Sequence, residues 1–125
     1  MTSEEKSLLL KDLSARLAYY PKCEMIDELR VVNNEKDSSY ISTLFPKHIE
    51  LFSYHNNFTI KPYLRPMSSM TEEEKIDYRA FFNYDGVEYP EEYIDWLNAH
   101  HFDYRGLIPK GLAIAVTEEN NPYKS

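Results

Sequence analysis

The sequence predicts an α+β fold: an N-terminal helix, a small antiparallel β-meander of four or five strands that is strongly twisted or barrel-like, and two C-terminal helices packed on it. Three observations lead to this fold class. Leucines recur at helical spacing near the start, apolar and polar residues alternate between positions 22 and 60, and helix-start signals return after Met70. The length of 125 residues fits a single domain spanning residues 1–125.

The first helix is indicated by four leucines that share one helical face: Leu9, Leu10, Leu13 and Leu17. Thr2 and Glu5 have the spacing of a capping box, which marks a helix start. The helix is expected to end before Pro21, because proline cannot continue it.

The strands are expected between residues 22 and 60, where the period changes from helical to alternating. The polar run at residues 33–37 has the composition of a connection between two strands. Residues 49–54 alternate between apolar and polar side chains and are interpreted as a further strand, followed by a turn and a last strand from Phe58. Pro62 and Pro66 are expected to end the sheet, so that residues 61–67 run extended across the surface.

The C-terminal helices are indicated by their start signals. Thr71 and Glu74 form a second capping box, and this helix is expected to run to about Phe82. The next helix begins at Pro90, a favoured first helical residue, and ends near His101. Residues 107–116 are apolar and are expected to finish in a closing strand, and residues 118–125 in a frayed tail.

The acidic balance, 14 basic against 21 acidic residues, argues against direct binding of nucleic acid, which requires basic surface. An acidic surface that mimics nucleic acid and inhibits a DNA-binding protein is an alternative. No apolar stretch approaches the ~20 residues of a membrane span, and Leu8–Leu10 is too short for a signal peptide. With Cys23 as the only cysteine, these features favour a cytoplasmic protein without membrane contact.

Catalytic motifs are not apparent, and we expect no catalytic residue, no metal ligand and no cofactor. Three glycines cannot form a glycine-rich phosphate loop, and Cys23 is interpreted as a small buried residue. His100 and His101 fit a helix C-terminus, where they complement the helix dipole and bond its last carbonyls. A small metal-dependent enzyme centred on His100, His101 and Asp103, with His48 or His55 arriving from the sheet, is the enzymatic alternative.

The aromatic content favours protein interaction, since tyrosine and arginine are enriched at contact hot spots. Eleven tyrosines occur in the chain, and they either fill a small core or form a contact patch. The sequence therefore predicts a non-enzymatic interaction module with an unknown protein partner, or with a second copy of the chain. Its expected contact residues are Tyr63, Arg65, Trp96, His101, Tyr104 and Arg105.

Two segments resemble a known family: KPYLRPMSSMTEEE at residues 61–74 and WLNAHHFDYRGLI at residues 96–108. Together with residues 6–17 they resemble small uncharacterised proteins encoded by gut Bacteroidetes genomes and their prophages and other mobile elements. After Leu17 that family tends to have a Pro-Tyr-Gly turn, where this chain has Ala-Tyr-Tyr-Pro. The resemblance implies a bacterial or phage accessory system and carries over no catalytic residues.

Overall fold

The structure is a computed structural model that describes residues 1–83, 86–87 and 90–124. Its centre is a four-stranded sheet in the order β4-β1-β5-β8. The strands are β1 (Lys22–Asp27), β4 (Ser39–Thr43), β5 (Phe58–Leu64) and β8 (Ile114–Ala115). β1 runs antiparallel to β4 and to β5, whereas β8 runs parallel to β5.

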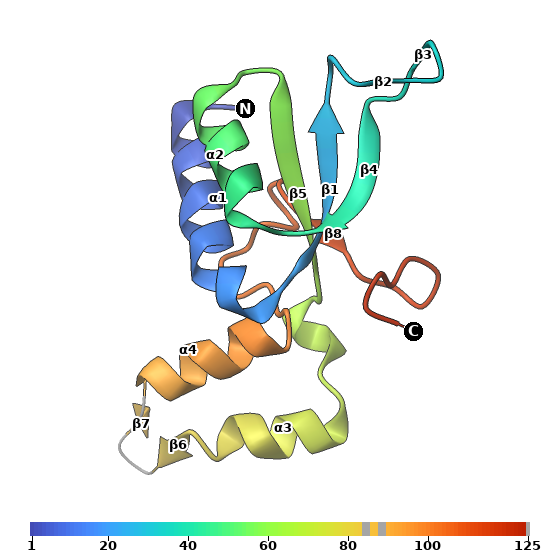
Figure 1. The fold of residues 1–125 in the computed structure, drawn as a ribbon. Coiled ribbons are helices and arrows are strands. Elements are labelled where there is room, and N and C mark those ends of the chain that lie inside the picture. The colour runs from blue at the N-terminus through green and yellow to red at the C-terminus, as the bar shows by residue number, and fades with distance from the viewer. Residues whose placement is uncertain (84–85, 88–89, 125) are drawn as a thin grey trace.

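The α+β class is confirmed, but the antiparallel meander is wrong: the sheet is mixed and it does not close into a barrel. The chain leaves β5 and returns as β8 only after two further helices. That long crossover is what lets the last strand run parallel to β5. β4 and β8 are the two edges of the sheet and do not pair with each other (Figure 1).

One face of the sheet is covered by two helices, α1 (Ser3–Arg16) and α2 (Pro46–Tyr54), with η1 (Leu17–Tyr19) extending α1 (Figure 1). The core lies between them and the sheet. Among the residues that the structure describes, its buried members are Leu9, Leu13, Cys23, Met25, Leu44, Phe52, Phe58, Ile60, Leu64, Leu107, Leu112 and Ala113. The capping box of Thr2 and Glu5 is present at the start of α1.

The interpretation of residues 49–54 as a strand is wrong, because they belong to α2. Pro46 occupies the first helical turn, where its fixed φ and missing N–H cost nothing. His48 and Phe52 are four residues apart and both are buried, which is the helical spacing. Six residues of alternating hydrophobicity are too few to separate the two periods.

Pro62 does not end the sheet, contrary to the expectation: it is buried within β5, opposite Cys23 of β1. The N–H of Glu28 donates to the carbonyl of Asn57 (3.0 Å), and hydrogen-bonded and non-bonded pairs alternate from there along the β1–β5 ladder. Cys23 and Pro62 form a non-bonded pair in this alternation, so the backbone nitrogen of Pro62 faces away from β1, and pairing with β8 begins only at Tyr63. The missing N–H of Pro62 therefore removes no ladder bond.

A two-stranded hairpin projects from the end of the sheet beside β4 (Figure 1). It is formed by β2 (Val31–Val32) and β3 (Glu35–Lys36), which pair antiparallel. Asn33 and Asn34 connect them with positive φ values of 53° and 65°, as a two-residue hairpin turn requires.

The two C-terminal helices are α3 (Glu72–Arg79), preceded by η2 (Met67–Ser69), and α4 (Pro90–Ala99). They lie beyond the end of the sheet rather than over its face, which α1 and α2 already occupy (Figure 1). The short pair β6 (Phe82–Asn83) and β7 (Gly86–Val87) lies between them in sequence. The capping box of Thr71 and Glu74 is confirmed. Within the described ranges, no helix is both long enough and apolar enough to cross a bilayer.

Candidate functional site

Residues 61–74 and residues 96–108 meet at Arg65. Its N–H donates to the carbonyl of His101 (2.7 Å), and its carbonyl accepts from the N–H of Asp103 (2.9 Å). This bridge continues the direction of β5 and places Arg65 beside Phe102. Segments far apart in the sequence are thus joined through their backbones.

The Arg65 side chain fixes the start of α3 against this bridge. Its guanidinium carbon lies 4.3 Å from the centre of the Phe102 ring, and its two terminal nitrogens bind the two carboxylate oxygens of Glu74 at 2.7 and 2.6 Å. The hydrogen bonds from Arg65 are the main reason that the pKa of Glu74 is lowered to about 2. Arg65 therefore has its charge matched within the chain.

A buried charge network joins α1 to the segment after α4. Arg16 is fully buried; its Nε donates to Asp12 (2.8 Å) and its Nη2 to the carbonyl of Phe102 (2.7 Å). Arg105 Nε donates to the other Asp12 oxygen (3.1 Å), and the Tyr104 hydroxyl donates to Asn98 (2.9 Å). Because buried charges must be paired, this network is best understood as structural.

The remaining expected contact residues also have partners within the chain. Tyr63 is only 7% exposed, and its carbonyl accepts from the Tyr123 hydroxyl (2.8 Å). The Trp96 ring contacts His100 at a centroid distance of 4.3 Å, and the His101 ring stacks on Tyr123 at 4.0 Å. Five of the six residues are half-buried. Their role in binding a partner stays a prediction, and each of them already contributes to the fold.

The histidine segment after α4 has three separate sets of contacts. His100 Nδ1 lies 2.9 Å from the carbonyl of Trp96, which confirms that this histidine bonds a carbonyl of the last helical turn. His101 has a positive φ of 62°, and burial, followed by the charges of Arg16 and other neighbours, lowers its pKa to about 4. The carboxylate of Asp103 accepts the N–H groups of Leu107 and Ile108, both at 2.9 Å.

A metal centre at this segment would require these side chains to converge. In the ranges that the structure describes, no group of three or more histidine, cysteine, aspartate and glutamate side chains is placed to hold a metal ion. Cys23 is buried, as expected, and burial raises its pKa to about 12, so the thiol remains protonated.

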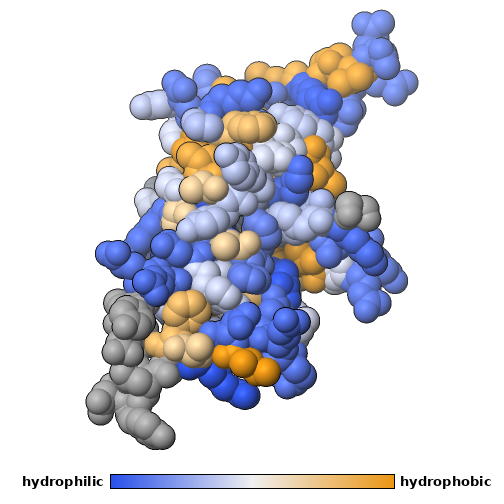
Figure 2. Space-filling model, turned by 60° about the horizontal axis from the view of Figure 1, so that its bottom comes forward, coloured by the Kyte–Doolittle hydropathy of each residue, from blue (hydrophilic) through white to orange (hydrophobic). Residues whose placement is uncertain are grey.

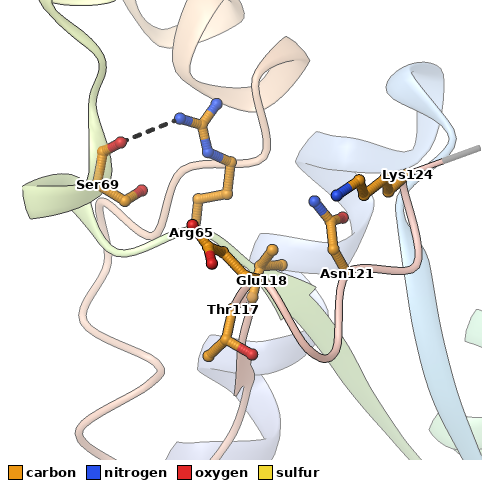
Figure 3. Close-up of a pocket in the computed structure, with 7 residues that line it drawn as sticks. Arg65, Ser69, Thr117, Glu118, Asn121 and Lys124 are labelled. Atoms are coloured by element: carbon orange, nitrogen blue, oxygen red, sulfur yellow. Dashed lines mark hydrogen bonds between the residues drawn. The ribbon is translucent and has the colours of Figure 1, made fainter.

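An open pocket of about 630 Å³ lies between η2 and the C-terminal segment, lined by Arg65, Ser69, Val116, Thr117, Glu118, Asn121 and Lys124 (Figure 3). Arg65 donates to the Ser69 carbonyl at 3.3 Å on one wall. The Ser69 hydroxyl is engaged with the carbonyl of Pro66 (2.7 Å), as in a turn. The charged groups of this pocket are of both signs, so it has no evident preference for an anion or a cation.

The outer edge of β4 is a different kind of site, because a row of backbone groups faces away from the sheet there. Asp27 N–H donates to Ser38 (2.7 Å) and Leu44 N–H donates to Pro21 (2.9 Å) at the two ends of the β1–β4 ladder. Bonded pairs alternate in an antiparallel ladder, so Tyr40 and Ser42 face β1. Ser39, Ile41 and Thr43 consequently point their N–H and C=O groups outward.

Two of these outward carbonyls receive weak or local bonds. Arg30 donates to the Ser39 carbonyl at 3.4 Å, and the Ser42 hydroxyl donates to the Thr43 carbonyl at 2.9 Å. β4 is the terminal strand in the order of the sheet, and within the described chain no strand pairs with its outer side. A strand edge of this kind can accept another strand.

Exposed apolar side chains gather on and around this edge. Ile41 is 56% exposed, and large apolar residues are also exposed in the neighbouring hairpin and in the turn after β4: Leu29, Val31, Val32 and Phe45. The space-filling view shows hydrophobic surface at the upper right, where the hairpin projects (Figure 2). The sequence pattern did not reveal this site, since alternation alone does not distinguish an edge strand from a central one.

Comparison of the chain with protein-family models, with curated proteins and with solved structures gives no match.

Proposed function

We propose that the protein is a non-enzymatic interaction module that binds an extended segment of a partner polypeptide along β4. The outward row of Ser39, Ile41 and Thr43 backbone groups is the observation that carries this proposal. Strand addition at an exposed edge derives affinity from main-chain hydrogen bonds and specificity from alternate side chains. Here Ile41 offers the apolar side chain.

The two edges of the sheet differ in a way that supports this role. β8, the other edge, has only two residues, and short edge strands are poor templates for pairing. β4 has five residues, Ser39–Thr43, with no charge and no proline to discourage pairing. Proteins commonly protect such an edge. In the part of the chain that the structure describes, no strand pairs with the outer side of β4, which makes it the best-supported binding surface here.

The resemblance of residues 61–74 and 96–108 to proteins of gut Bacteroidetes supports a role in a bacterial or mobile-element accessory system. In this proposal the six residues expected from the sequence act indirectly. Arg65, Tyr104 and Arg105 stabilise the junction between the sheet and the C-terminal helices, and the contact surface lies at β4.

The test is capture of proteins from a Bacteroidetes lysate by the immobilised chain, compared with an Ile41→Pro variant. Proline at position 41 removes an outward N–H and no bond to β1, so the sheet is retained while strand addition is blocked. Ile76→Ala is the matched control, because Ile76 is 65% exposed on α3, away from the edge.

We expect a protein that binds the wild type and Ile76→Ala but not Ile41→Pro, and that slows amide exchange at Ile41 and Thr43. Nuclease treatment and added duplex DNA should leave the complex intact. Release by DNA would instead favour the nucleic-acid mimic. Equal capture by all three proteins would refute the assignment of β4.

A further inference from the structure

We infer that the strand received by β4 is β4 of a second copy of the same chain, paired antiparallel about a two-fold axis at Ile41. This inference rests on the proposed function, because it names the partner of the same edge. Three properties of the β4 edge indicate a second copy as the partner: its sequence, the direction of its backbone groups, and the residues that flank it.

The sequence of β4 is complementary to itself in this register. Ile41 faces Ile41 of the partner, Ser39 faces Thr43, and Tyr40 faces Ser42. Opposed residues of an antiparallel pair lie on the same side of the sheet, so the isoleucines meet on one face and the tyrosine–serine pairs on the other. No facing pair combines like charges, which would destabilise the pairing.

The backbone donors and acceptors of the two copies also match in this register. The outward residues Ser39, Ile41 and Thr43 of one copy lie opposite Thr43, Ile41 and Ser39 of the other, so each N–H finds a carbonyl. A register shifted by one residue would place outward groups opposite residues that already bond to β1. The ladder therefore selects the register centred on Ile41 or one shifted by two residues, and the centred register pairs the whole strand.

The flanking residues continue the contact. The hairpin adjoins the Ser39 end of β4 and the turn with Phe45 follows the Thr43 end, so antiparallel pairing brings the hairpin of one copy to the turn of the other. Both carry exposed apolar side chains, Val31 in the hairpin and Phe45 in the turn. Each flank carries exposed charges of both signs, Glu35 and Lys36 in the hairpin and Lys47 and Glu50 after the turn, so each offers opposite charges to the other.

Charge and the placement of α1 and α2 favour this edge for self-association. Each copy carries a net charge of −7, so two copies repel each other, least where the approaching strands are uncharged. α1 and α2 lie toward β5, away from β4 (Figure 1). The C-terminal segment is the nearer neighbour of this edge, since Glu119, Asn120 and Pro122 line a small pocket together with Ile41. A two-fold axis perpendicular to the sheet would join the copies into one continuous sheet with all four of these helices on the same face.

The test is sedimentation over a concentration series together with cysteine cross-linking. The wild type and Ile76→Ala should reach twice the 14.8 kDa chain mass. Ile41→Lys, which sets two like charges opposite each other on the axis, should remain a monomer, as should Ile41→Pro. If Ile41→Pro does not fold, Ile41→Lys decides, because an exposed lysine on an edge strand is well tolerated.

Cross-linking tests the register. Cα atoms of directly opposed bonded residues lie about 5.5 Å apart, within reach of a disulfide. Ile41→Cys should therefore form a covalent dimer under mild oxidation much faster than Ile76→Cys. The native Cys23 is buried, so it should not form cross-links between chains. Equal rates for the two variants, or a dimer that persists in Ile41→Lys, would overturn the inference.

The outcomes separate this inference from the proposed function. A monomeric wild type that still captures an Ile41-dependent partner overturns self-pairing and keeps the module. A monomer that captures nothing at β4 overturns both. A dimer cross-linked at position 41 supports both, with the partner identified as the chain itself.

Discussion

The single residue Glu74 both caps α3 and binds Arg65. Its carboxylate accepts from the backbone of Thr71 in the capping box and from both terminal nitrogens of Arg65. We expect Glu74→Gln to lower the free energy of unfolding at neutral pH by about 1–2 kcal/mol, the range of a hydrogen-bonded pair between charged groups that remains partly exposed. Chemical denaturation monitored by circular dichroism measures this loss.

The pH dependence of the same pair has a definite direction. The pKa of Glu74 is lowered in the folded chain from 4.5 to about 2, so its contribution is complete above about pH 4.5 and is lost as the pH falls toward 2. Glu74→Gln should remove this part of the acid sensitivity. Glu73→Gln, in the same helical turn but exposed, is the control and should behave like the wild type.

His101 should make the fold sensitive to mild acid. Burial and the charge of Arg16 lower its pKa from 6.5 to about 4, so between these values the unfolded chain binds a proton that the folded chain does not. The free energy of unfolding should therefore decrease as the pH falls from 6.5 to 4. His101→Asn, which suits the positive φ, should show a smaller decrease over this window.

Nuclear magnetic resonance provides a direct check of this prediction. The ring protons of His101 should titrate with a midpoint near pH 4 in the folded protein. A midpoint near 6.5 would show that the ring is solvated in solution, and that its stacking on Tyr123 does not persist.

Among the contacts between elements, the C-terminal segment contributes the Tyr123 side chain to the sheet. The alternation of the β1–β5 ladder makes Lys22 and Tyr63 the next bonded pair, but the Tyr123 hydroxyl lies between them. It accepts from the Lys22 N–H (3.0 Å) and donates to the Tyr63 carbonyl (2.8 Å). Tyr123 thus continues the ladder at the end where the two strands separate.

We expect Tyr123→Phe to lower the free energy of unfolding by about 1–3 kcal/mol, because two backbone groups lose their shared partner. Thermal and chemical denaturation measure the effect. Tyr54→Phe removes a hydroxyl from a tyrosine that is 80% exposed, and should change stability little. Equal effects of the two variants would mean that the C-terminal segment does not hold this position in solution.

Local sequence signals predicted where helices and strands begin or end better than they predicted which elements lie next to each other. Both capping boxes, the start of α4 at Pro90 and the closing strand near Ile114 follow from sequence patterns that depend on a few adjacent residues. The predictions for α2 and Pro62 were wrong because both depend on contacts with other parts of the chain. A short apolar segment becomes helix or strand according to what it packs against, and Pro62 is tolerated because its nitrogen faces away from the neighbouring strand.

The whole molecule joins two regions through one strand. β5 passes from the covered sheet to the bridge at Arg65, and the segment after α4 returns through Phe102 to meet Arg16 of α1. Residues 61–74 and 96–108 stand out in the sequence as two separate segments. The sequence did not show that they form one junction, because that depends on contacts between residues far apart in the chain.

Helix signals and hydrophobic periods act within a few residues, so the α+β class, the first and last helices and the burial of Cys23 could be predicted from sequence patterns. The folded chain was needed to find the strand order, the parallel β8, the pairing of arginines with distant carboxylates, and the exposure of β4. These depend on which strand remains without a neighbour and which charges meet in the interior, and long-range packing alone determines both.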